Sequence, residues 1–132
     1  MHVDHRPWGR FDLLTLNQQV SVKILTVNPG ARLSLQRHEM RDEWWHIMGD
    51  GLVVEIDGVE RQVKAGDRVW IPRGVVHRVR NTEVSIALFV ELAFGHFDED
   101  DIERLEDDYA RVGRAIECPS VPGFIPVPAR LT

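Results

Sequence analysis

The chain has 132 residues, of which 43% are hydrophobic and 28% charged, a balance typical of one globular domain that leaves little room for a second. Its net charge of -5 argues against nucleic acid as a partner, because that binding is driven by basic surface. The lone cysteine, Cys118, excludes a disulfide within the chain. Together with the lack of a signal-peptide pattern it favours a cytoplasmic protein, and no apolar run approaches the ~20 residues of a membrane span.

From residue 11 to residue 94 the chain reads as many short strands separated by turns. Turn residues recur at intervals of about ten residues, which favours an antiparallel sandwich or barrel. The turn signals are Pro29-Gly30, Gly49-Asp50-Gly51, Asp57-Gly58, Ala65-Gly66-Asp67, Pro72-Arg73-Gly74 and Asn81-Thr82. Of these, Asp57-Gly58 between two apolar runs predicts a tight hairpin.

The hydrophobic period then lengthens to three or four residues. This spacing predicts one face of a C-terminal helix, made by Ile102, Leu105, Tyr109, Val112 and Ile116. Asp100 and Glu103 fit a capping box, and the eight carboxylates of residues 98–108 crowd the start of the segment, where a helix dipole favours acid. We expect one domain over residues 1–116 and an extended, proline-rich tail over residues 117–132.

Four side chains in two stretches predict a metal site. Gln36 and His38 are two apart in an expected strand, so they leave the same face. Glu43 follows after a short turn, and His77 opens a later strand that a barrel can bring alongside the first. Each of these residues alone would more often be an ordinary packed or solvated side chain. Together they offer the nitrogen and oxygen donors of one divalent ion, most readily zinc, with manganese, iron, nickel or cobalt also compatible.

Basic and acidic side chains lie near the expected site. Lys23 has the parity of inward-facing positions in its strand, Arg41 lies two residues before Glu43, and Arg73 lies in a turn near the expected barrel mouth. These three residues are candidates for contact with an anionic substrate, although ordinary salt bridging is the alternative. Glu91 lies on the small, mixed face of its strand and could serve as a base or support the metal. Pairing with a neighbouring arginine is its alternative role.

The two stretches resemble the two conserved motifs of the cupin superfamily. The second motif matches throughout, at Gly66, Pro72, Gly74, His77 and Asn81. Over residues 6–114 the chain resembles, more specifically, the cupin domain of type II mannose-6-phosphate isomerases. The matching segments include Arg6-Pro7-Trp8-Gly9, Leu33-Ser34-Leu35-Gln36, Ile71-Pro72, His77-Arg78 and Glu99-Asp100-Asp101-Ile102.

That resemblance implies an all-β fold, the cupin double-stranded β-helix or jelly-roll barrel, here expected to carry the C-terminal helix. It implies Gln36, His38, Glu43 and His77 as metal ligands and the interconversion of mannose 6-phosphate and fructose 6-phosphate. In that reading, the catalytic residues are Lys23, Arg41 and Glu91, and the substrate-binding residues are Lys23, Arg41 and Arg73. The chain departs from the family at Ala93, where glutamine is usual, and it shows no nucleotidyltransferase signature.

Two other functions remain open from the sequence. One is a sugar-phosphate-binding cupin without turnover, and the other is a different cupin enzyme acting on a small anionic substrate, such as an oxygenase or epimerase. Gln36 argues against an iron oxygenase, which usually has histidine there. We also expect a homodimer, because the parity of Leu33, Leu35 and Trp44 turns them away from the ligand face and leaves an apolar outer surface. No membrane or nucleic-acid partner is expected.

Overall fold

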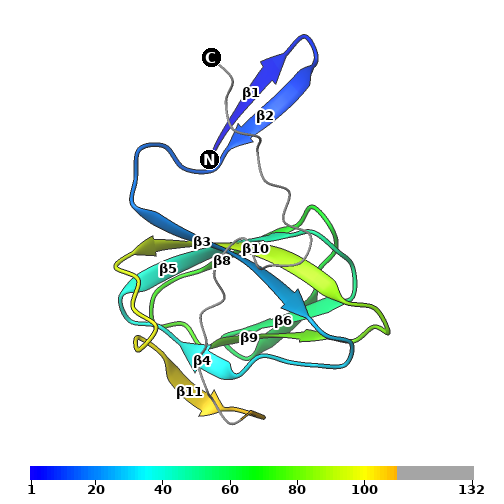
Figure 1. The fold of residues 1–132 in the computed structure, drawn as a ribbon, viewed down its shortest axis with the longest axis vertical. Coiled ribbons are helices and arrows are strands. Elements are labelled where there is room, and N and C mark those ends of the chain that lie inside the picture. Colours follow the sequence, from blue (N-terminus) through cyan, green and yellow to red (C-terminus); the bar gives the residue numbers. More distant parts are fainter. Residues whose placement is uncertain (110–132) are drawn as a thin grey trace, which may run out of the picture.

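Strands make up all the regular structure of residues 1–109, the part of the chain that the computed structural model describes (Figure 1). The expected all-β architecture is therefore confirmed for this part. None of its elements is a helix of the kind that could cross a membrane. A separate two-stranded sheet at the N-terminus pairs β1 (His2–Arg6) with β2 (Gly9–Leu13) and stands out from the rest of the fold (Figure 1).

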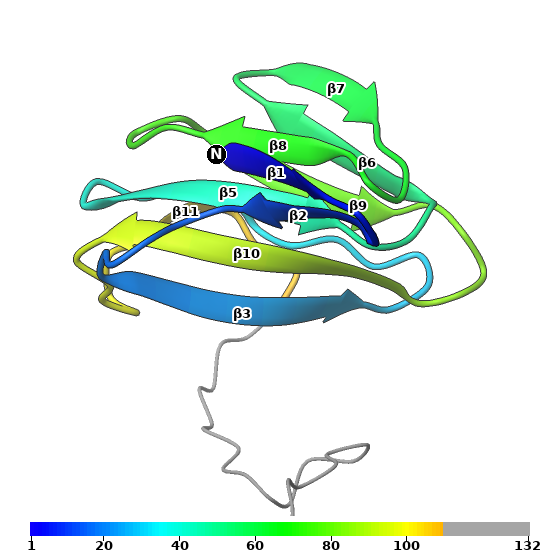
Figure 2. The same cartoon turned by 90° about the horizontal axis from the view of Figure 1, so that it is seen from above.

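Two larger antiparallel sheets lie face to face (Figure 1), and Figure 2 looks down onto the four-stranded one. The four-stranded sheet has the order β3-β10-β5-β8, formed by β3 (Val20–Val27), β10 (Ala87–Gly95), β5 (Arg41–Ile47) and β8 (Arg68–Ile71). The five-stranded sheet has the order β11-β4-β9-β6-β7, formed by β11 (Glu103–Glu106), β4 (Leu35–Arg37), β9 (His77–Asn81), β6 (Leu52–Ile56) and β7 (Val59–Gln62). Neighbouring strands in each sheet are mostly distant in sequence, which is the crossed connectivity of a jelly roll.

The core fills one part of the space between the sheets, and polar residues fill the other. Strand β5 shows the division, because its inward side chains change along one face from Arg41 and Glu43 to Trp45 and Ile47. Trp45 packs on Phe89 of β10 at a ring-centroid distance of 4.6 Å. Burial of a large apolar side chain contributes roughly 1.5–3 kcal/mol, so this half of the barrel can offset the cost of burying the charged half.

Turn chemistry sets the hairpin between β6 and β7 as the sequence indicated. Asp57 and Gly58 both have left-handed backbones, with φ of 50° and 78°. A two-residue turn with positive φ at both positions matches the right-handed twist of the strands that it joins.

The predicted C-terminal helix is wrong where the structure describes it. Residues 103–106 form strand β11, which pairs with β4 in antiparallel register with a bulge around Leu105. Three of the acids that suggested a helix start instead meet arginines of the sheet. The pairs are Glu103 with Arg37, Glu106 with Arg78 and Asp108 with Arg32. These contacts, and the free edge of β4, outweigh a weak local preference for helix. The remaining part of the expected helix and the tail at residues 117–132 lie outside the described residues.

The expected outward position of Leu33 is also wrong, because its side chain packs against the core cluster. The chain around Leu33 and Ser34 lies outside β4, so strict strand alternation does not extend to it. Trp44 does lie on the opposite face of β5 from Glu43 and is half-buried.

Candidate metal centre

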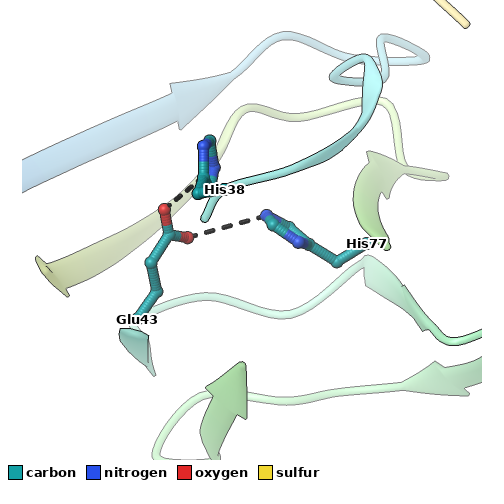
Figure 3. Close-up of side chains that lie close together, drawn as sticks. All are labelled: His38, Glu43 and His77. Atoms are coloured by element: carbon teal, nitrogen blue, oxygen red, sulfur yellow. Dashed lines mark ion pairs between the residues drawn. The ribbon is translucent and has the colours of Figure 1, made fainter. Parts of the chain in front are cut away.

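Two histidines and a glutamate point toward one another between the sheets (Figure 3). Their ligand atoms lie within 4.8 Å of one another, and all three residues are buried. His38 directly follows β4, Glu43 lies in β5 and His77 begins β9, so the site joins the two sheets. His38 Nε2 is 3.1 Å from Glu43 Oε1, and His77 Nε2 is 3.7 Å from Glu43 Oε2.

Backbone carbonyls fix which ring nitrogen of each histidine carries a proton. His38 Nδ1 lies 2.7 Å from the Asp101 oxygen, and His77 Nδ1 lies 2.9 Å from the Val75 oxygen. A carbonyl oxygen only accepts, so each Nδ1 must donate. Each Nε2 therefore faces Glu43 with its lone pair when the ring is neutral, an arrangement typical of metal-ligating histidines.

His77 gives the clearest sign that the site suits a cation. Its Nε2 is buried without a hydrogen-bond partner among the described residues. Burial lowers the pKa of His77 by more than the Val75 carbonyl and the Glu43 carboxylate raise it, so the neutral ring is favoured. A buried lone pair without a donor is costly, and a divalent ion would satisfy it together with the Glu43 carboxylate.

Gln36 lies next to these residues, as its sequence position predicts. It is the register partner of His77 across β4 and β9, and its Nε2 is 3.3 Å from His38 Nε2. The Ser34 hydroxyl donates to its Oε1 at 2.6 Å. An amide in this position can turn its oxygen toward an ion held by the three other residues.

Glu91 lies beside the cluster, and Trp45 joins it to Glu43. The Trp45 indole N–H faces Glu43 Oε2 at 3.1 Å and Glu91 Oε1 at 3.2 Å. Burial, with the nearby Glu43 carboxylate acting in the same direction, raises the pKa of Glu91 to about 8. Burial opposes ionisation of Glu43 too, but hydrogen bonds involving His38 and Glu91 hold its pKa well below the ordinary value. One buried carboxyl is thus ionised while its neighbour retains a proton near neutral pH.

The three candidate cations are placed differently from one another. Arg41 is buried and donates from Nε to Glu43 Oε1 at 3.0 Å, with Nη2 3.3 Å from His38 Nε2. Lys23 is the register partner of Glu91 on the adjacent strand, and its Nζ reaches toward Glu99. Arg73 is half-exposed, and its ion pair is with Asp42, 3.5 Å away, on the other face of β5 from the cluster. The structure therefore brings Lys23 and Arg41 to the site and turns Arg73 aside.

The sequence did not indicate the contribution of the segment after β10. Its acids were interpreted as a helix start, yet Asp101 accepts hydrogen bonds from the N–H groups of Glu39 and Met40 and fixes His38 through its carbonyl. Phe97 lies against both Lys23 and Arg41. The only sequence signal for these roles was the match of Asp101 to the family pattern.

Comparison with known proteins defines the family. The family model for the mannose-6-phosphate isomerase C-terminal domain matches residues 1–107, and the chain belongs to this family. Among curated relatives, the alginate biosynthesis protein AlgA of Pseudomonas aeruginosa is 39% identical over 81% of this chain. The mannose-1-phosphate guanylyltransferase ManC of Salmonella typhimurium is 33% identical over 82% of it. The chain spans only 22% and 23% of the lengths of these two relatives.

Solved structures support the same fold. The capsular polysaccharide assembling protein CapF of Staphylococcus aureus matches with a TM-score of 0.61 and 19% identity, over 80% of this chain and 34% of that one. A Cupin 2 conserved barrel domain protein of Salinispora arenicola matches with a TM-score of 0.54 and 25% identity, over 64% and 70% of the two chains. The barrel is therefore a cupin barrel.

Proposed function

We propose that this chain, as a member of the mannose-6-phosphate isomerase C-terminal family, holds one divalent ion and interconverts mannose 6-phosphate and fructose 6-phosphate. The observation that carries the proposal is the buried His38, Glu43 and His77 cluster with the raised-pKa carboxyl of Glu91 beside it. Gln36 is the proposed fourth ligand. Zinc is the first candidate, because two imidazoles with oxygen donors suit it well.

The reaction moves a hydrogen between adjacent carbons of the sugar through an enediol. When bound, the ion supplies a Lewis acid that polarises the substrate oxygens and favours the developing negative charge. Glu91 is the proposed general base, which takes the proton from one carbon and returns it to the next. Its pKa of about 8 is closer to neutrality than that of an ordinary carboxyl, so its ionised form is a stronger base.

The surrounding side chains hold this arrangement in place. The Trp45 indole N–H is shared between the Glu43 and Glu91 carboxyls and so orients both side chains in the site. Arg41 stabilises the ionised form of Glu43 and offers a second positive group near the reacting oxygens. Lys23 is the proposed phosphate contact, because it is half-exposed and lies at the edge of the cluster.

A coupled assay of fructose 6-phosphate formation tests this function. The protein is stripped with a chelator, reloaded with zinc or manganese and given mannose 6-phosphate. We expect turnover that is lost on chelation and restored on reloading. Glu91→Gln should abolish turnover while leaving metal content intact. Arg80→Ala is the control, because Arg80 pairs with Glu60 on the solvent-exposed side of the five-stranded sheet.

The same assay also tests the alternative function. If the reloaded protein binds mannose 6-phosphate and converts none, the chain is a sugar-phosphate-binding cupin. That result would remove Glu91 from any catalytic role.

A further inference from the structure

The segment between β10 and β11 crosses from one sheet to the other (Figure 1). It passes beside the candidate metal centre, because its Asp101 carbonyl accepts from His38. Both of its ends are fixed to the turn that links β4 and β5. At one end, Gly95 has φ of 115°, and a Cβ there would lie 2.6 Å from the Met40 carbonyl oxygen. At the other end, the Asp101 carboxylate accepts from the Glu39 and Met40 N–H groups, 2.9 Å from each. Residues 96–100 form the span between these anchors.

This span covers the two cations of the site. The Phe97 ring centroid lies 4.3 Å from Lys23 Nζ and 4.3 Å from Arg41 Cζ, within the range of a cation–π contact. The Asp98 carbonyl oxygen accepts from Arg41 Nη1 at 3.3 Å. Glu99 Oε1 lies 3.0 Å from Lys23 Nζ. The segment thus places an aromatic ring and a carboxylate where an anionic ligand would approach.

The Lys23–Glu99 pair is the part of this cover that a ligand can most easily open. The Glu99 side chain is 77% exposed and that of Lys23 is 38% exposed, so the pair is solvated and weak. Arg41, by contrast, is buried and bound to Glu43, which leaves its charge already neutralised. Lys23 is therefore the cation at the site whose partner can leave without exposing a buried charge.

We propose that Lys23 Nζ is the anion subsite of this barrel and that Glu99 is its resident competing anion. A phosphate monoester binds by exchanging with Glu99, so the carboxylate selects for dianionic ligands that bind Lys23 more strongly than a single carboxylate does. Glu99 is thereby a specificity-determining residue. The inference rests on the proposed function for the identity of the ligand, but it concerns binding and needs no turnover.

Direct titration of the metal-loaded protein with mannose 6-phosphate, in low salt, tests the exchange. Glu99→Gln should bind mannose 6-phosphate about two- to fivefold tighter than the unmodified protein, the change expected when an exposed ion pair is removed. Lys23→Met should weaken binding. The matched control is Asp100→Asn, which removes the same charge one residue away, where the carboxylate makes no hydrogen bond or ion pair with the described residues. It should leave binding unchanged.

The outcomes separate this inference from the proposed function. If Glu99→Gln binds more tightly and the protein has no isomerase activity, the proposed anion subsite at Lys23 is supported and the proposed isomerase function is refuted. Turnover with unchanged binding by Glu99→Gln overturns the subsite alone. An equal gain from Asp100→Asn shows general repulsion by the acidic segment and also overturns the subsite. The inference fails as well if neither the unmodified protein nor Glu99→Gln binds mannose 6-phosphate.

Discussion

Replacing Glu91 by Gln should make the metal-free protein more stable at neutral pH. Burial and the neighbouring Glu43 carboxylate raise the pKa of Glu91 from 4.5 to about 8. The folded protein therefore holds a proton that the unfolded chain releases above pH 4.5, and stability falls as pH rises from 4.5 toward 8. A glutamine has the shape of the protonated carboxyl and does not titrate, so it avoids this loss.

The size of the effect follows from the same shift. From pH 4.5 to pH 7 is 2.5 pH units, and at about 1.4 kcal/mol per unit the loss is at most about 3.5 kcal/mol. Near pH 4.5 the two proteins should have nearly equal free energies of unfolding. Urea unfolding in the presence of a chelator, at pH 5 and pH 7, measures the difference. If the stability gap between Glu91→Gln and the unmodified protein does not widen with pH, the assigned protonation of Glu91 is wrong.

Three further predictions concern other parts of the fold. Gly95→Ala should destabilise the protein by about 1–3 kcal/mol more than Gly58→Ala, because both glycines have positive φ but only Gly95 has backbone within 3 Å of an added Cβ. Thermal unfolding compares the two variants, and equal losses of stability would refute the close approach of Gly95 to the β4–β5 turn. Lys23→Met should raise the KM for mannose 6-phosphate more than it lowers kcat in the coupled assay; the reverse pattern would exclude a phosphate contact. The homodimer remains a prediction, now based on the outward Val22, Ile24 and Trp70, each more than half exposed, and a monomer mass in light scattering would exclude it.

Local signals were sufficient for much of the fold and for the centre of the site. The Asp57-Gly58 turn formed the expected hairpin because its geometry depends on two adjacent residues. The convergence of His38, Glu43 and His77 was predictable because strand parity and the cupin motif spacing both encode it. The metal at the site stays a prediction, since His, Glu and His offer suitable donors but do not fix which ion binds.

Contacts between distant segments account for the errors. The helix predicted after residue 100 depended on the period of a few apolar residues. The observed strand β11 is instead stabilised by arginines distant in the sequence, with Arg37 lying 66 residues before Glu103 and Arg78 lying 28 residues before Glu106. Arg78 shows the same dependence, because it is buried between the Leu33 carbonyl and Glu106, and both partners are distant from it in the sequence. The roles of Trp45 and Phe97 likewise depend on side-chain directions that no local pattern specifies.

Metal stoichiometry tests the central claim most directly. The protein and two variants are reloaded with zinc, freed of excess ion and analysed for metal, with circular dichroism to show that the barrel is folded. The variants are His77→Ala, at the candidate centre, and His46→Ala, a control on the opposite face of β5. We predict one ion per chain in the unmodified protein and in His46→Ala, and a sharp loss in folded His77→Ala. An unmodified protein that retains no ion, or a His77→Ala variant that retains as much, would contradict the proposed metal centre.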